Sequence, residues 1–488
     1  LTANSTLNVT GTTTNSGTLA TNSTANFTGT VTNSGTFNSN GISNLTGNFS
    51  NSGATSALNL NGDFYLAGNW ANAGTFTPNN KAVFFNAATG TQTITNTNAT
   101  NSNTETFAYL INNKAAGTLQ LSSNVIVNGT SGDVLQLLGA ANLDLNAKTL
   151  TLSGDNGNIL ASGGVRNIIS GVAGGVLAIS GNKVVTSASS GSLVLGTTAN
   201  PSYLTTALNK GLNFGTGNLT TVNSVLQINT NGYANVNAPK YANTSTLIYN
   251  AVNPYTVNIE WIGNSNTAGI GIPQNVTLNS SNITMPTGAR GMAGTLTINS
   301  GSTINLEGSI GSDLSIGGNL VNNGTFNTNN RTIIFNGTSA QTITGATTFD
   351  YLTINNSTGL TLSGTSSSVT VNQTLALTSG KITLGANNLT IGASGSITGN
   401  SSSNYIVTAG TGQLKRTVGS GAVVFPVGSA SAYNPITFTN AGTSDVYGVI
   451  LTSGTVPNVQ DATYTVNDRW LVSEATSGGS NLTVVPQW

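Results

Sequence analysis

Charged residues, histidine and cysteine are scarce or missing in this 488-residue chain. Lys and Arg total 13, Asp and Glu total 13, and together they make up 5% of the residues, against about 25% in an ordinary soluble domain. His and Cys are absent, which excludes Ser-His-Asp and Cys-His catalysis, zinc sites built on His or Cys, iron–sulfur clusters and disulfides. Most known kinds of enzyme site therefore cannot be built from this sequence.

The net charge is zero, and this excludes two kinds of partner. Nucleic acid is bound through Lys and Arg side chains that neutralise phosphates, and anionic membrane surfaces attract the same residues. No apolar run reaches the roughly 18 residues of a membrane span. The first residues, LTANSTLNVT, lack the basic start and apolar stretch of a signal peptide. We expect no nucleic acid partner and no direct membrane insertion. Either an export signal has been removed, or the sequence is a piece of a longer chain.

Gly, Asn, Thr and Ser dominate instead, and residues 1–76 repeat them in regular columns. One column contains Asn15, Asn33, Asn51 and Asn72, and another contains Gly17, Gly35, Gly53 and Gly74. In both columns the first two intervals are equal and the third is slightly longer. Three apolar columns keep the same period, and one of them consists of Val9, Phe27, Leu45 and Leu66. This pattern predicts three short strands and three corners in each repeat.

Stacked coils explain these columns. Neighbouring strands lie about 4.8 Å apart, so coils of about 18–23 residues can stack with each face forming a parallel sheet. Apolar columns fill the interior, and stacked Asn side chains hydrogen-bond along their column. Gly and Asn tolerate the positive φ that corners need. We therefore predict an all-β fold, a parallel β-helix or β-solenoid. The alternative, a sandwich of unrelated strands, does not explain several columns with one period.

A longer repeat lies on top of the short one. Residues 68–86 match residues 318–336 without a gap. The resemblance extends over residues 62–155, called the first segment below, and residues 312–395, called the second segment. The β-helix is therefore expected to contain two related parts.

Two further regions differ in texture. Residues 160–290 have a weaker period, which predicts irregular coils with longer side loops. From residue 418 onwards the strands become longer and contain Pro and aromatic residues, which indicates a partial β-sandwich. The predicted domains are a β-helix rod at 1–417 and a sandwich-like segment at 418–488.

Several strings resemble repetitive secreted surface proteins and adhesins of the Bacteroidetes, which are substrates of the type IX secretion system. The strings are GNLVNNGTF (318–326), IIFNGTSAQTI (333–343), FDYLTINN (349–356) and FPVG (425–428), the last followed by DRWLVSE. The resemblance covers most of residues 60–488. It implies a right-handed β-helix in an extracellular protein of the bacterial cell surface. The chain shows neither a signal peptide nor the family's sorting domain, so the export route is implied by resemblance alone.

Parallel β-helices also include enzymes that cleave polysaccharides with paired carboxylates. The acidic residues here mostly stand alone, and the intervals between Asp133, Asp144 and Asp155 are too short for one coil, so these three should not stack. We expect the acidic residues, Glu105 included, to be solvated residues of turns. Ser180-Gly-Asn-Lys matches S-x-x-K, but that mechanism needs a helix. The sequence therefore predicts no enzyme, no catalytic residue, no metal and no cofactor.

Three hypotheses on function remain. The leading one is a non-enzymatic structural protein, a rigid stalk or filament-forming segment of an adhesin. The alternative is a carbohydrate-binding or polysaccharide-active β-helix with an aromatic platform for sugar or partner contact, made of Tyr233, Tyr241, Tyr249, Tyr255 and Trp261. A third is an ice-binding solenoid, suggested by outward-facing Thr positions such as Thr14 and Thr32.

The chain itself is one expected partner. An open β-helix end and an incomplete sandwich expose strand edges, which proteins normally cover. Coils could stack end to end, or residues 1–10 could complete the sandwich of a neighbouring copy and so build a filament. The other explanation is that the missing strands lie in the same polypeptide.

Overall fold

The structure is a computed structural model that describes residues 1–454 and 468–487, and these residues form strands, turns and two 3-10 helices, η1 (Ala99–Asn101) and η2 (Ile259–Trp261). The chain divides into two compact units. The first contains residues 1–248 with the short pieces 258–260 and 269–271, and the second contains the rest from residue 249 onwards. The sequence predicted no division here, only a weaker period at 160–290.

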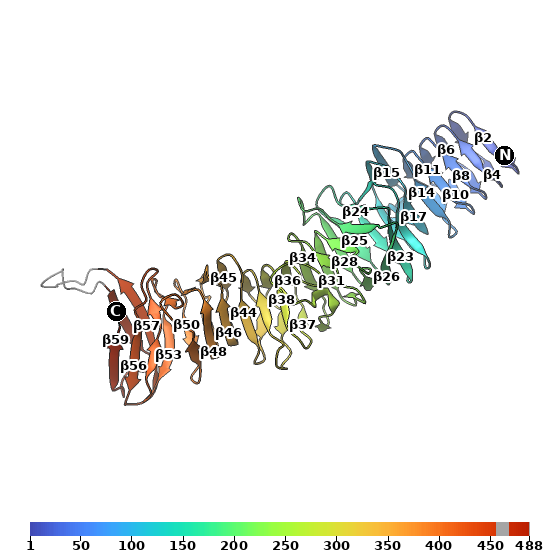
Figure 1. Cartoon of the computed structure of the whole chain (residues 1–488). Coiled ribbons are helices and arrows are strands. Elements are labelled where there is room, and N and C mark those ends of the chain that lie inside the picture. Colours follow the sequence, from blue (N-terminus) through green and yellow to red (C-terminus); the bar gives the residue numbers. More distant parts are fainter. Residues whose placement is uncertain (455–467, 488) are drawn as a thin grey trace. The chain divides into compact units, whose positions relative to one another are not determined.

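Parallel strands stack coil upon coil in the first unit (Figure 1). The strands of one early coil are β2 (Leu7–Val9), β3 (Thr13–Asn15) and β4 (Thr18–Thr21), and those of the next are β5 (Ala25–Phe27), β6 (Val31–Asn33) and β7 (Thr36–Ser39). Each strand pairs in parallel with its counterpart one coil later. The register places Val31 between Thr13 and Phe49, so the length of a coil here equals the interval of the sequence columns. The predicted β-solenoid is confirmed.

Four sheets form the faces of the first unit. Two of them run along it for eleven strands each, from β2 to β32 (Tyr233–Ala234) and from β3 to β33 (Lys240–Tyr241). The third face changes partway. One sheet, starting at β1 (Thr2–Ala3), ends at β13 (Thr75–Thr77), and another begins at β16 (Thr104–Phe107) and continues through β19 (Asn124–Val127) and β22 (Thr149–Leu152). The chain between β13 and β16 is therefore where one face is exchanged for another.

Coils lengthen in the middle of the first unit. Gly175 lies opposite Leu204, so the coil between them is longer than any in the range that the sequence columns predict. The predicted coil length is therefore wrong for this part of the solenoid. The added residues lie in the corners, for example at Gly163, Gly164 and Gly174, which all have positive φ.

The interior consists of the predicted apolar columns. Val31, Phe49 and Trp70 follow one another in register and are fully buried. Aromatic rings meet edge to face between the columns, as for Phe49 and Phe64, whose centroids are 5.3 Å apart. Such pairs add about 0.5–1.5 kcal/mol beyond the burial of their surface.

The second unit contains the second segment and repeats features of the first. Phe76 and Phe107 pack at 5.6 Å, and their counterparts Phe326 and Phe349 pack at 6.1 Å. Gln341 is buried, and its amide donates to the carbonyl of Ile316 at 2.9 Å. Gln92 of the first segment donates to Leu66 in the same way at 2.8 Å.

Strand pairing in the second unit changes at β53 (Leu414–Val418). This strand pairs in parallel with β50 (Leu389–Ile391) and antiparallel with β57 (Asp445–Ser453). A second antiparallel sheet consists of β54 (Val423–Phe425), β56 (Ile436–Asn440) and β59 (Leu482–Pro486). Phe438 of the second sheet packs on Tyr447 of the first, with centroids 5.9 Å apart. These mixed sheets at the end of the second unit are consistent with the sandwich-like segment that the sequence predicts.

Candidate functional site

The column of Asn residues forms a hydrogen-bonded ladder inside the first unit. Asn15 Nδ2 donates to Asn33 Oδ1 at 2.7 Å, Asn33 donates to Asn51 at 2.7 Å, and Asn51 donates to Asn72 at 2.9 Å. All four amides point the same way, so each bond polarises the next. A carboxyl group accepts the last hydrogen bond of the ladder, because Asn72 Nδ2 donates to Glu105 Oε2 at 2.9 Å.

Glu105 is buried, with 1% of its surface exposed, and two more side chains donate to the same oxygen. Trp70 Nε1 donates at 2.8 Å and Asn96 Nδ2 at 3.2 Å. Burial raises the pKa of Glu105, and the hydrogen bonds from Trp70, Asn72 and Asn96 only partly oppose this. The expectation that the acidic residues are solvated is wrong here, and also for the buried Asp144 and Glu260.

The second segment lacks this arrangement. Asn322 corresponds to Asn72, but its amide donates to the hydroxyl of Thr347 at 3.1 Å. Leu320 stands at the position of Trp70. The solenoid therefore forms the same coil without a buried carboxylate or an indole, so these two side chains are an addition specific to the first segment.

An inserted loop accompanies them. Residues 92–95 and 341–344 match as QTIT, but eleven residues separate QTIT from Phe107 and only four separate it from Phe349. The extra residues lie in residues 96–104, called the inserted loop below, which contains η1.

Hydrogen bonds fix the conformation of the inserted loop. Asn98 is buried, its amide donates to the carbonyl of Gly74 at 2.7 Å, and its Oδ1 accepts from the backbone of Thr100. Ser102 and Asn103 have positive φ. At the base, Ser123 Oγ donates to the carbonyl of Asn96 and accepts from its backbone N–H, both at 2.9 Å.

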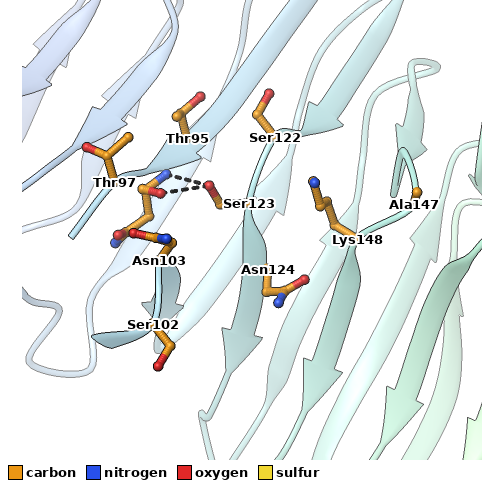
Figure 2. A pocket seen from close by; sticks show the side chains of 10 residues that line it. Thr95, Thr97, Ser102, Asn103, Ser122, Ser123, Asn124, Ala147 and Lys148 are labelled. Carbon is orange, nitrogen blue, oxygen red and sulfur yellow. Dashed lines mark hydrogen bonds between the residues drawn. The ribbon is translucent and has the colours of Figure 1, made fainter. Parts of the chain in front are cut away.

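A groove of about 760 Å³ lies against the inserted loop (Figure 2). It crosses the corners that precede β16, β19 and β22 in three successive coils. This groove is called the corner groove below. Its lining residues are Thr95, Asn96, Thr97, Ser102, Asn103, Ser122, Ser123, Asn124, Ala147 and Lys148. Figure 2 shows Thr97 and Asn103 of the loop on one side and Lys148 on the other, across Ser123 and Asn124. The lining is polar, with one ammonium group and no carboxylate.

The polar groups of the corner groove are open to a ligand. Within the part of the chain that the structure describes, six of its side chains make no hydrogen bond to the protein: Thr95, Thr97, Ser102, Asn103, Ser122 and Lys148. Asn124 Oδ1 accepts from the backbone of Thr149 at 3.0 Å, which leaves its Nδ2 as a donor. The groove therefore presents hydroxyl and amide groups that both donate and accept, together with one cation.

Two other cations of the first unit, Lys114 and Arg166, serve the fold. Lys114 Nζ donates to the carbonyls of Ala87 and Thr89 at 3.3 and 3.2 Å. Arg166 donates to the carbonyl of Leu138 at 3.0 Å. Burial lowers the pKa of both side chains. They satisfy carbonyls at wide corners, whereas Lys148 faces the corner groove.

The aromatic platform suggested by the sequence does not lie on the surface as a whole. Tyr241, Tyr249 and Trp261 are buried, so they cannot contact a sugar. Trp261 Nε1 donates to the carbonyl of Gly291 at 2.7 Å, which is a structural contact. Tyr255 is half-buried, and Tyr233 is 36% exposed. The aromatic side chains gather at 233–261 mainly because they fill the interior.

The suggested Thr ladder is short. Thr14 and Thr32 are in register, but the next positions in the same column are Ser50 and Ala71. An ice lattice needs a longer regular array than two Thr residues, so this column gives ice binding no support.

The column of Gly residues has a steric role. A Cβ on Gly35 would lie 2.0 Å from the carbonyl oxygen of Gly17, and one on Gly74 would lie 2.2 Å from Ser56 Oγ. At Gly17 and Gly53 there is open space. None of the four has a positive φ. The expected reason for Gly at these corners, positive φ, is therefore wrong. Close approach of the preceding coil requires Gly at positions 35 and 74, and neither φ nor space requires it at positions 17 and 53.

Comparison with protein-family models, with curated proteins and with solved structures finds no match for the chain. Across residues 1–454 and 468–487, no helix is long and apolar enough to cross a membrane. The same residues contain no cluster of three or more acidic side chains placed to hold a metal ion.

Sequence reasoning missed the pair of Trp70 and Glu105 and the corner groove. One signal was present. When the two segments are aligned, the inserted loop, Trp70 and Glu105 are among the places where the first segment departs from the second, and the loop is an insertion rather than a substitution.

Proposed function

We propose that this chain is a structural segment of an extracellular surface protein, in which stacked coils act as a stalk or spacer. The observation that carries the proposal is the ladder from Asn15 to Asn72, in which every coil repeats the contacts of the one before. Repetition of this kind extends a protein along one direction without requiring any further chemistry.

Low charge fits the same role. In a parallel stack each residue recurs about 4.8 Å above its counterpart, so a charged column would repel itself. Uncharged columns such as Asn8, Asn26 and Asn44 avoid this, and their side chains bond to one another at 2.7 and 2.8 Å. Buried ionisable side chains are few and hydrogen-bonded. Lys114 and Arg166 donate to corner carbonyls, and Glu105 accepts from the end of the ladder. Asp144 and Glu260 accept from backbone N–H groups.

The finer parts of the proposal rest on resemblance. The similarity to Bacteroidetes surface proteins supports an adhesin exported by type IX secretion and a location at the bacterial cell surface. Self-association into filaments through the strand edges at the ends belongs to the same proposal.

Two measurements test this function. Pulling on the chain in single-molecule force spectroscopy should release coils one after another, because each coil contacts only its neighbours. Each released coil should lengthen the chain by one step. The coil from Thr13 to Val31 should give a step of about 65 Å at full extension, and the longer coil from Gly175 to Leu204 a step of about 100 Å. One all-or-none release of each unit contradicts the stalk. Antibodies against the chain should label intact cells, and labelling only after lysis contradicts the surface location.

A further inference from the structure

We propose that the corner groove binds a sugar chain that carries anionic groups, either carboxylates or sulfate esters, with Lys148 as the residue that recognises the anion. This goes beyond the structural function, which does not need a groove.

The inserted loop that borders the corner groove occurs in the first segment and not in the second. The second segment joins β45 (Gln341–Thr344) to β46 (Thr347–Asn355) through only Gly345 and Ala346. The first segment replaces this short corner with the inserted loop. In repeat proteins, insertions in single repeats often form the binding face.

The base of the loop is held more firmly than the fold requires. Asn96 lies at the floor of the groove and is fixed from two sides, by Ser123 through its backbone and by Glu105 through its amide. The second segment folds with Thr347 where Glu105 stands. We infer that the buried Glu105 and Trp70 serve to position Asn96 and the inserted loop.

The chemistry of the lining selects the ligand class. Hydroxyl and amide groups that both donate and accept suit the hydroxyls of a sugar. A volume of about 760 Å³ is within the usual range of ligand sites. The ammonium of Lys148 is the one charged group of the lining, so an anionic substituent gains a charge-assisted hydrogen bond there.

Other ligand classes fit less well. A metal ion such as calcium prefers several carboxylates, and the lining has none. Nucleic acid needs several cations along the backbone, and the groove offers one. An apolar ligand would meet no aromatic or branched apolar side chain in the lining.

Binding can be measured by calorimetry on the full chain with three probes of equal length: an oligogalacturonate, a sulfated galactan oligosaccharide and an uncharged galactan oligosaccharide. We expect at least one acidic probe to bind tenfold or more tightly than the uncharged one, and more weakly as salt is raised. Lys148→Gln should reduce that affinity by about 10-fold to 100-fold, the range for a hydrogen bond to a charged group. Lys210→Gln, at an exposed lysine of the same unit outside the groove, should leave it unchanged.

A second variant tests the loop. Residues 96–106 are replaced by Gly-Ala-Thr-Thr, the sequence of 345–348, together with Trp70→Leu, so that the first segment acquires the coil of the second. This variant should retain its circular dichroism spectrum and lose acidic-sugar binding. If this variant unfolds, the affinity of Lys148→Gln for the acidic probes alone tests the proposal.

Each outcome bears on the proposal. Preference for the galacturonate identifies a carboxylate ligand, and preference for the sulfated probe identifies a sulfate ester. Equal affinity for charged and uncharged probes, binding unaffected by Lys148→Gln, or no binding of either acidic probe at millimolar concentration overturns the assignment. None of these results affects the force and labelling tests of the structural function.

Discussion

The indole of Trp70 donates a 2.8 Å hydrogen bond from Nε1 to Oε2 of Glu105, a residue 35 positions later in the chain. Both side chains are almost fully buried. Trp70 belongs to the aromatic core, where it packs on Phe49 at 5.2 Å and on Phe107 at 5.4 Å. Glu105 accepts the last hydrogen bond of the Asn ladder, from Asn72. The pair therefore connects the packing of the coil to the position of the inserted loop.

Replacement of Glu105 by Gln is expected to change how stability depends on pH. Burial raises the pKa of Glu105 in the folded chain above its unfolded value, which is about 4.3. Its contribution to stability is therefore fully present below that pH and is lost as the pH rises through the folded pKa. The melting temperature of Glu105→Gln relative to the wild type should increase from pH 4 to pH 8 in thermal scans.

Glu307→Gln provides a control of opposite sign. Hydrogen bonds from Ser309 lower the pKa of Glu307. Its contribution is therefore present above the unfolded pKa and is lost as the pH falls. The melting temperature of this variant relative to the wild type should be lowest at neutral pH. If both variants change in the same direction, the environment assigned to Glu105 is wrong.

Trp70 and Glu105 should be energetically coupled. Trp70→Leu leaves a cavity and removes one donor from a buried carboxylate, at a cost of about 2–4 kcal/mol. Adding Glu105→Thr recreates the pair Leu320 and Thr347 of the second segment. We expect the double variant to lose less stability than the sum of the single variants, by about 0.5–3 kcal/mol. Urea denaturation followed by circular dichroism measures this difference.

Trp261→Leu is the matched control for that cycle. Its indole donates to the carbonyl of Gly291 and has no role at Glu105. The losses from Trp261→Leu and Glu105→Thr should therefore add. Additive losses for Trp70→Leu and Glu105→Thr as well would show that the two side chains do not act together.

Much of the fold could be predicted because its determinants are local and periodic. The apolar column of Val31, Phe49 and Trp70 follows directly from the spacing, and so does the ladder from Asn15 to Asn72. Once coils lengthen, the position of a residue within the coil no longer follows from counting. For this reason Glu105 was expected in solvent, and Trp261 on the surface.

The candidate site could not be predicted for a related reason. Asn96, Ser123 and Lys148 belong to three successive coils, and the intervals between them differ from the period of the early columns. Their proximity depends on where each corner begins, and corners carry no apolar period. Only the comparison of the two segments marks this region in the sequence.

The inner Asn ladder should contribute more to stability than the outer one. Asn33 is fully buried, accepts from Asn15, and donates within 3.0 Å to Asn51 and to the carbonyls of Gly35 and Ala57. Asn33→Ala leaves these groups without partners in the interior, and we expect a loss of about 2–4 kcal/mol.

Asn26 is the matched control for Asn33. It belongs to a ladder on the outer face, bonding to Asn8 at 2.7 Å and to Asn44 at 2.8 Å. Water can replace these bonds, so Asn26→Ala should cost about 0.5–1 kcal/mol. Amide hydrogen exchange in β3, β6 and β9 (Phe49–Asn51) measures both variants. Equal losses would mean that burial does not distinguish the two ladders.

Within the Gly column, substitution should destabilise the fold where the preceding coil approaches closely and should be tolerated where it does not. Gly35→Ala places a methyl group 2.0 Å from the carbonyl oxygen of Gly17, so the two coils must separate. This breaks the hydrogen bond from the N–H of Thr36 to that carbonyl, which is 2.7 Å long. A loss of about 1–3 kcal/mol is expected for Gly35→Ala, as for other overpacked sites.

Gly53→Ala is the matched control in the same column, because its new methyl group meets no atom within 4 Å and the residue has no positive φ. It should therefore stabilise by up to about 1 kcal/mol, because Ala restricts the unfolded chain. The melting temperatures of Gly35→Ala and Gly53→Ala should fall on opposite sides of the wild type. If both fall below it by the same amount, then conformation at the corner, and not the space between coils, decides why Gly occupies this column.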